Sequence, residues 1–362
     1  MSSCSEGNKF DGRIGLRISS IFVILVGSAL GAIVPVYAAR SRGTSKDLKV
    51  PEQVFFVARY FGSGVILATA LIHLLVPAFE ALTDDCLTGP ITEYPWAAGI
   101  VLMSWFVIFI VHVLTSRYEK SDQDHAKPEP SETAAIRTPA DCKYRDDPSS
   151  AELSDESQRQ STPLQETFAS EEPRVEDRCI SEDRADSNHS RENAFNPDSY
   201  AAQLTGLFIL EFGVIFHSVF IGLTLSVAGG EFATLYVVLT LHQTFEGIAL
   251  GARLGSIDWP TSKRWTPYLM AIGYALSTPI AIAIGLGVRT TFNPESQTTL
   301  IVNGVFDSIS AGILIYTSLV ELVAHDFLFS PKMRAAPLKV VYASIGFMML
   351  GAGLMALLGK WA

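Results

Sequence analysis

Long apolar runs alternate with short polar segments along most of this chain. Eight of the runs reach the roughly 20 residues that a helix needs to cross a bilayer. They are Leu16–Tyr37, Val54–Phe79, Trp96–Leu114, Ala201–Val227, Phe232–Leu254, Pro267–Val288, Leu300–Leu322 and Val340–Leu358. The first run is longer than the apolar part of a cleaved signal, and other runs follow it. The pattern predicts an all-α integral membrane protein with eight transmembrane helices.

One long polar segment, residues 116–200, interrupts the apolar runs. It is rich in Ser, Glu, Asp and Pro and poor in aromatic residues, so we expect a disordered loop. The predicted organisation is a tail at 1–15, three spans within 16–115, this loop, and five spans within 201–362. The net charge of −10 comes largely from the loop. It points to no nucleic-acid partner, whereas the spans require a lipid bilayer.

Basic residues in the short loops set the expected orientation, because Lys and Arg favour the cytoplasmic side. The loops after the first, fifth and seventh spans hold ten of them, and the alternate loops hold only Arg289. Lys9, Arg13 and Arg17 oppose this orientation but are fewer. We therefore expect the loop 116–200 to be cytoplasmic and both termini to be extracellular.

The fifth run contains His242 and Glu246 in the sequence HQTFEG, among apolar neighbours. Ionisable groups inside a membrane are costly and usually line an aqueous path or pair with one another. At positions i and i+4 these side chains share one helix face, where they can bind one divalent cation or simply hydrogen-bond and tie helices together. His217 lies ten residues before the outer end of the preceding run, and His242 lies ten residues after the next outer start. Both histidines are then about 15 Å deep, near the bilayer midplane, on neighbouring antiparallel helices.

His217, His242 and Glu246 form a common ligand set for zinc, with iron or manganese as alternatives. Ser218 and Gln243 each follow one of the histidines and offer weaker oxygen ligands. The sequence therefore predicts a divalent-metal site of three primary and two secondary residues.

Other ionisable residues mark candidate ends of an ion path. His73 and Glu80 lie toward the outer end of the second run, and Asp307 lies in the outer part of the seventh. An ion arriving from outside meets these side chains first, although a purely structural role is the alternative for each. Glu321 and His325, again four residues apart, lie at the inner end of the seventh run. They can accept a released ion or form a charge cluster at the membrane surface.

The four cysteines separate by compartment under this orientation. Cys4 in the tail and Cys86 after the second span fall outside, where disulfides persist, whereas Cys142 and Cys179 fall in the cytoplasmic loop. We predict a Cys4–Cys86 disulfide. The alternative is a free thiol on a frayed terminus, because sequence does not show whether the two residues approach within bonding distance.

These motifs together resemble the ZIP family of zinc and iron transporters. The segments that carry the resemblance are HSVFIG followed by HQTFEG, ILATALIHLLVPAFEAL, FDSISAGILIYTSLVELVAHDF and DGRIGLRISSIFVILVGS. The likeness covers all eight spans and is nearest to fungal and plant plasma-membrane members. It implies metal uptake into the cytosol, spans arranged three, two, three, and a metal site on the fourth and fifth spans. The ligands it implies are His217, His242 and Glu246, with Ser218 and Gln243 beside them.

The chain also departs from some members of that family. Ile221 stands where some have a glutamate four residues after the histidine of the fourth span, and Thr278 stands where some have a carboxylate before the proline at 279. Support for a second, bridged metal position is therefore weak. The loop 116–200 also lacks the run of alternating histidines that many members carry.

The predicted function is transmembrane transport with Zn²⁺ as the substrate and without a cofactor. Transport of Fe²⁺ or of a broad range of divalent metals is the first alternative. An intramembrane metal-dependent hydrolase is a further alternative, but no span carries HExxH and the one central glutamate is used as a ligand. The oligomeric state stays open, with a homodimer as one option.

Overall fold

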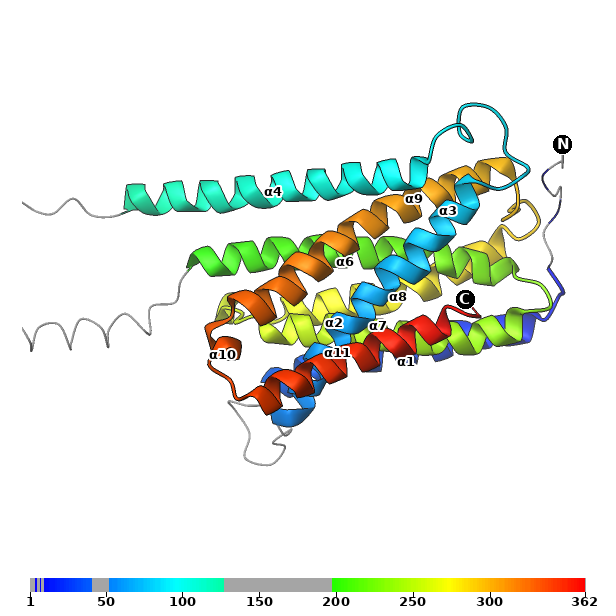
Figure 1. Ribbon diagram of the computed structural model, residues 1–362. Helices are drawn as coiled ribbons and strands as arrows, with labels where there is room; N and C mark the ends of the chain where they lie inside the picture. Colours follow the sequence, from blue (N-terminus) through cyan, green and yellow to red (C-terminus); the bar gives the residue numbers. More distant parts are fainter. Residues whose placement is uncertain (1–3, 5–6, 8–9, 41–51, 127–196, 362) are drawn as a thin grey trace, which may run out of the picture. The chain divides into compact units, whose positions relative to one another are not determined.

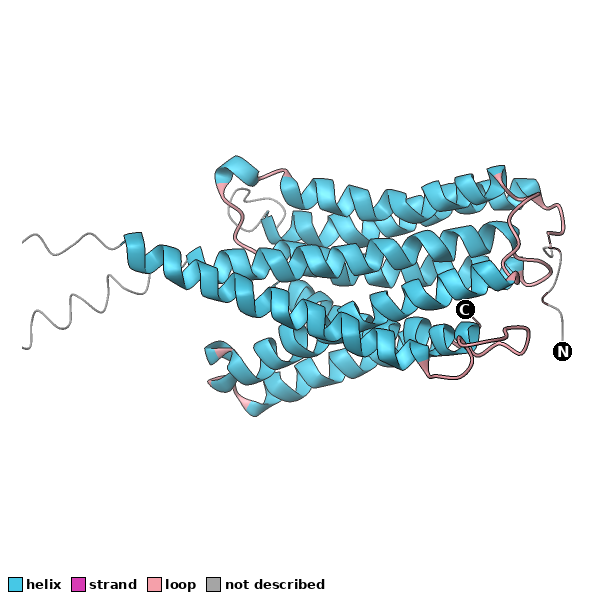
Figure 2. Ribbon diagram, turned by 90° about the horizontal axis from the view of Figure 1, so that it is seen from above, coloured by secondary structure: helices cyan, strands magenta, loops and turns pink. Residues whose placement is uncertain are grey.

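The structure is a computed structural model that describes residues 4, 7, 10–40, 52–126 and 197–361. The chain forms two units, one of residues 1–121 with 197–362 and one of residues 122–196. Most of the predicted loop, residues 127–196, lies outside the described residues. The account below concerns the first unit, in which every described regular element is a helix, as predicted (Figures 1 and 2).

The helices of the described chain follow the predicted apolar runs closely. The elements are α1 (Ile14–Arg40), α2 (Glu52–Ala68), η2 (Thr69–Leu75), α3 (Val76–Leu82), α4 (Trp96–Ala126), α6 (Pro197–Val227), α7 (Phe232–Ser256), η3 (Thr261–Lys263), α8 (Thr266–Gly287), α9 (Gln297–Tyr316), η4 (Thr317–Phe329), α10 (Pro331–Arg334) and α11 (Leu338–Leu358). The segments η2 and η4 are π-helical, so α2–η2–α3 and α9–η4 are each one continuous helix.

Both termini lie at one end of the bundle, here called the terminal end (Figure 1). The opposite end, where α6 begins, is called the loop end.

Seven helical stretches in the described chain are long and apolar enough to cross a membrane. They correspond to every predicted span except the fifth, α7. Its 25 residues extend about 37 Å, which is sufficient length, and it must cross the bundle because α6 ends at the terminal end and α8 begins at the loop end (Figure 1). Polar residues such as His242, Glu246 and Arg253 lower the hydropathy of α7. α7, which carries two of the three candidate site residues, is therefore the least apolar of the predicted spans.

Two helices run past the ends of their predicted spans. α4 continues through Ala126 and α6 begins at Pro197, so both ends of the predicted loop 116–200 are helical. Sequences such as YEKSDQDHA contain good helix formers, and a helix need not end where its apolar run does. The predicted arrangement of three, two and three spans stays a prediction.

α1 is the main packing partner of α7, and α8 is the main packing partner of α6. α1 also contacts α8, while α2 packs against α7 and α11. A Cβ on Gly247 would lie 2.9 Å from the Ser28 carbonyl oxygen, and one on Gly251 would overlap the Ala32 carbonyl, so these glycines permit the close α1–α7 contact.

α6 and α7 touch one another only sparingly. We expected them to be close neighbours. They meet through the side chains of Ser218 and Gln243, but α8 and α1 supply most of their packing.

A fully buried arginine fixes the start of α1 to the end of α6. Arg17 donates hydrogen bonds to Asp11 and to three backbone carbonyls, and its guanidinium lies 4.4 Å from the ring centroid of Phe232. The accepting carbonyls are those of Leu225, Ser226 and Ala228. Carbonyls at a helix C-terminus lack partners within the helix and favour a nearby cation. Arg13 also pairs with Asp11, so this carboxylate offsets one of the two arginine charges that oppose the predicted orientation.

The predicted disulfide is confirmed. Cys4 and Cys86 are bonded, with 4.9 Å between their Cα atoms. The bond joins the N-terminal tail to the connection between α3 and α4 at the terminal end.

Candidate metal centre

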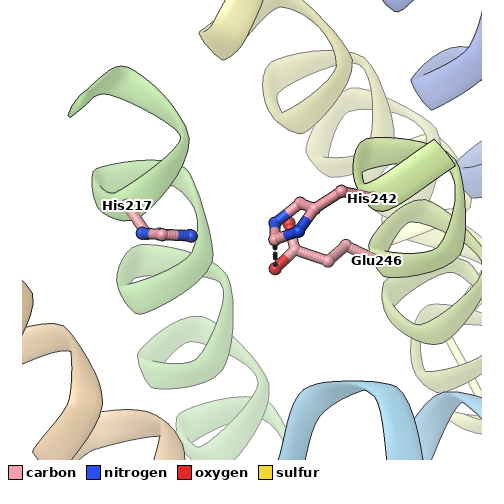
Figure 3. A group of neighbouring side chains, drawn as sticks. All are labelled: His217, His242 and Glu246. Atoms are coloured by element: carbon pink, nitrogen blue, oxygen red, sulfur yellow. Dashed lines mark ion pairs between the residues drawn. The ribbon is translucent and has the colours of Figure 1, made fainter. Parts of the chain in front are cut away.

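α6 and α7 bring His217, His242 and Glu246 into one cluster (Figure 3). One ligand atom from each residue lies within 4.8 Å of the others. His242 and Glu246 are one turn apart on α7, with 3.3 Å between Nε2 and Oε1. The ring centroids of the two histidines are 5.8 Å apart. A cation between the helices could thus be bound by two imidazole nitrogens and a carboxylate oxygen.

The three side chains are buried and short of hydrogen-bond partners. Their residues are 3%, 0% and 2% exposed, in chain order. Within the described chain, both ring nitrogens of each histidine and both carboxylate oxygens of Glu246 lack a hydrogen bond. Buried polar atoms are almost always satisfied in folded proteins. A bound cation would use the lone pairs that the protein leaves unpaired.

Ser218 and Gln243 link the two helices directly beside the cluster. The side-chain amide of Gln243 donates to Ser218 Oγ at 3.2 Å. Tyr274 of α8 donates its hydroxyl to the Gln243 backbone carbonyl at 2.6 Å. Tyr274 was not predicted from the sequence, although a hydroxyl group within an apolar run was an available indication. These contacts fix the separation of α6 and α7 at the depth of the cluster.

His73 lies beside the cluster rather than only near an outer opening. Its ring centroid is 4.6 Å from that of His242. Its Nε2 lies 2.8 Å from the Met355 carbonyl oxygen, so Nε2 carries the hydrogen and Nδ1 keeps a lone pair. Metal-binding histidines are commonly oriented by such a second hydrogen bond. His73 also lies in the π-helical segment η2, and π-helical turns are frequent at functional sites.

A cavity of about 390 Å³ lies between the cluster and the terminal end. Its polar lining includes His73, Glu80, His217, Asn303 and Asp307. Asp307 Oδ1 is 3.7 Å from His217 Nδ1. The three residues predicted for the outer path, on the second and seventh spans, therefore line one cavity that reaches a candidate ligand. Asn303 was not predicted, since a single asparagine in an apolar run carries no charge.

The residues predicted for the inner path do not converge on one point. Glu321 faces the bundle, where its Oε2 is 3.4 Å from Arg253 Nη2 and its Oε1 is 3.1 Å from His112 Nδ1. The His325 side chain is 60% exposed. Although they are only four residues apart, Glu321 lies inside the bundle and His325 lies at its surface.

An unpredicted ion pair lies beside Glu321. Asp326 is buried and receives two hydrogen bonds from the guanidinium of Arg59. Hydrogen bonds in a π-helix join residues i and i+5, so Glu321 and Asp326 are one turn apart in η4. Arg59 sits within the apolar run of the second span, and an ionisable residue in such a run was the indication available.

Comparison with known proteins identifies the family of this chain. Residues 14–359 match the family model described as ZIP Zinc transporter. The chain is 40% identical over 416 residues to zinc-regulated transporter 2 of Saccharomyces cerevisiae, covering 100% of this chain and 98% of that one. It is 39% identical over 363 residues to zinc-regulated transporter 1 of the same yeast, covering 98% and 90%. It is 32% identical over 351 residues to zinc transporter 5 of Oryza sativa subsp. japonica, covering 96% and 87%. The chain therefore belongs to the ZIP family of zinc transporters and is a multi-pass membrane transporter, not an enzyme.

Proposed function

We propose that this chain carries Zn²⁺ across the plasma membrane into the cytosol through the cluster of His217, His242 and Glu246. The convergence of these three buried side chains, whose ligand atoms make no hydrogen bond among the described residues, next to a cavity that His217 lines is the observation that carries the proposal. The names of the relatives refer to zinc and give no support to the alternative of iron. Zn²⁺ is the transported substrate here, not a resident cofactor.

The cavity at the terminal end supplies the route to the cluster. The carboxylates of Glu80 and Asp307 line it and raise the local concentration of a divalent cation. Zinc favours four ligands such as histidine nitrogens and carboxylate oxygens. His73 lies where the cavity meets the cluster and is the proposed fourth ligand after a side-chain shift, because the ligand atoms that lie within 4.8 Å of one another belong to the other three residues. Ser218 and Gln243, bonded to one another, serve as secondary oxygen ligands or hold the helices in place.

The charge of the site suits a transported ion. One carboxylate among neutral imidazoles leaves the bound Zn²⁺ with a net charge of about +1, which limits affinity and permits release. An inside-negative membrane potential favours inward movement of a divalent cation by about 4.6 kcal/mol per 100 mV. The proposal therefore needs no energy source besides the electrical and concentration gradients.

The outer surface of α4 is suited to lipid. Its exposed apolar side chains include Leu102, Met103, Phe106, Val107 and Ile110. Apolar surface of this extent is covered by a partner or a membrane, and a bilayer is the solvent that the length of these helices requires.

The proposed orientation predicts a definite pattern of cysteine labelling. On intact cells, after treatment with a membrane-impermeant reductant, an impermeant maleimide is expected to label Cys86 and to spare Cys142 and Cys179. The reason is that the Cys4–Cys86 disulfide lies at the extracellular terminal end in this proposal. Peptide mapping by mass spectrometry reads the result. Labelling of Cys142 or Cys179 in intact cells would reverse the orientation.

Uptake of radiolabelled zinc by cells that express the chain tests the proposed substrate. We expect saturable uptake that unlabelled zinc suppresses at lower concentration than iron, manganese or calcium. Cells with the empty vector provide the background. Stronger suppression by iron than by zinc would indicate that iron is the substrate instead of zinc. Uptake equal to background would reject the transport proposal.

A further inference from the structure

Among the described residues, voids of very different size lie on the two sides of the candidate site. Toward the terminal end lies the cavity of about 390 Å³. Toward the loop end the neighbouring void measures about 10 Å³, which is at the lower limit of the space that one water molecule needs. Its walls include Ser63 of α2, Ala249 of α7 and Leu322 of η4. In the described part of the chain, the site is therefore more accessible from the terminal end than along this face toward the loop end.

Arg253 stands directly on the route from the cluster to the loop end. It follows Glu246 by seven residues on α7, so the two share a helix face and lie about 10 Å apart along the axis. Arg253 also lines the small void. Its guanidinium places a fixed positive charge in front of a departing divalent cation, which it repels. An ion that follows this face of α7 meets this side chain before it reaches the loop end.

Two ion pairs join helices beside the small void. Arg253 Nη2 lies 3.4 Å from Glu321 Oε2, with both side chains about nine-tenths buried. Arg59 of α2 forms two hydrogen bonds with the buried Asp326. Both carboxylates belong to η4, so this segment is tied to α7 by the first pair and to α2 by the second. His112 of α4 approaches the other oxygen of Glu321.

The two pairs have different mechanical roles. α7 carries two members of the metal cluster, and the Arg253–Glu321 pair joins that helix to η4. The Arg59–Asp326 pair joins α2 and η4, neither of which carries a member of the cluster. A buried ion pair contributes little net stability, yet removal of one partner is costly. Such a pair is suited to distinguish two conformations rather than to stabilise the fold as a whole.

We propose that the Arg253–Glu321 pair is the latch of an inner gate, and that the Arg59–Asp326 pair anchors η4 so that the latch can engage. Separation of the latch opens the loop end and lets the ion leave the cluster. This inference rests on the proposed function, because a gate matters only if an ion passes. The latch biases an equilibrium between closed and open states, and its effect on access to the loop end can be measured without transport.

A cysteine at position 63 reports the state of the gate. Ser63 is 3% exposed and lines the small void. The parent for the test carries Ser63→Cys with Cys142→Ser and Cys179→Ser, and it keeps the Cys4–Cys86 disulfide. The purified protein is placed in lipid nanodiscs without zinc and treated with a maleimide too bulky to pass the metal cluster. The labelling rate of the new cysteine then measures opening at the loop end.

Neutralising either partner of the latch is expected to raise the labelling rate roughly tenfold or more, because the closed state loses its distinguishing contact. The variants are Arg253→Gln and Glu321→Gln. The reversed pair, Arg253→Glu with Glu321→Arg, and the conservative Arg253→Lys are expected to keep the slow rate of the parent. Arg264→Gln, which changes an exposed arginine at the same end, is the matched control and should also stay slow.

A second reporter separates gating from misfolding. Asn303→Cys, in the terminal cavity, should react with a small maleimide at the same rate in every background. Rates at position 63 that do not rise in the neutralised variants would overturn the latch. So would fast labelling in the reversed pair, since loss of packing rather than of pairing would then explain the opening. Zinc uptake by the parent is measured separately, so a failed transport proposal would be distinguishable from a failed latch.

Discussion

Glu246→Gln is expected to reduce saturable zinc uptake by roughly 100-fold or more, because the site loses its one carboxylate ligand where water cannot readily replace it. Glutamine keeps the size of the side chain and removes only the charge. Glu246 is 2% exposed, so its substitution exposes no new route for solvent. The measurement is radiolabelled zinc uptake in cells without other high-affinity uptake, normalised to the amount of protein at the cell surface.

His217→Ala and His242→Ala are expected to have effects of similar size, since each removes one of few ligands. Glu231→Gln is the matched control, because Glu231 is an exposed glutamate just before α7 and its substitution should leave uptake unchanged. Normal uptake by any two of the three ligand variants, at normal surface amount, would remove the site from the proposal.

Arg17→Met is expected to destabilise the folded protein by about 3–5 kcal/mol, because it removes several hydrogen bonds from a buried charged donor, each worth about 1.5–3 kcal/mol. Methionine fills much of the space of the arginine stem but leaves Asp11 and three carbonyls at the end of α6 without their donor. A large fall in the thermal unfolding midpoint of the purified protein would show the loss.

Arg13→Met provides the comparison for this stability prediction. Arg13 pairs with the same Asp11, but its side chain is 51% exposed, so the change should cost well under about 1 kcal/mol. Equal unfolding midpoints for the Arg13 and Arg17 variants would show that the buried hydrogen bonds of Arg17 do not hold α1 to α6.

The sequence predicted the helices well because span length is a local property. The apolar run Phe232–Leu254 forms most of α7 (Phe232–Ser256), and the run Ala201–Val227 forms all of α6 except its first turn. The helix ends outside the apolar runs were predicted less well, as α4 shows by continuing to Ala126. The π-helical segments were not predicted at all, since η2 and η4 have the same apolar composition as their α-helical neighbours.

The cluster of His217, His242 and Glu246 was predictable because depth can be counted along two helices from one short connection. The sparse packing of α6 on α7 was not predictable. It depends on how α1 packs on α7 and how α8 packs on α6, and these contacts join distant parts of the chain. The Arg59–Asp326 pair joins residues 267 positions apart, and no local pattern indicates such a partner. From the sequence, Arg253 was assigned to the basic residues of the loop after the fifth span. In the structure it lies within α7, where it is buried and paired with Glu321.

Zinc flux into vesicles that contain only the purified protein tests the central claim most directly. Proteoliposomes with a zinc indicator inside and an imposed inside-negative potential are compared with protein-free vesicles and with vesicles that carry Glu246→Gln. The account predicts saturable zinc accumulation by the parent protein, faster at more negative potential, and accumulation at the protein-free level for Glu246→Gln. Parent vesicles that gain no more zinc than protein-free ones, or a Glu246→Gln protein as active as the parent, would contradict it.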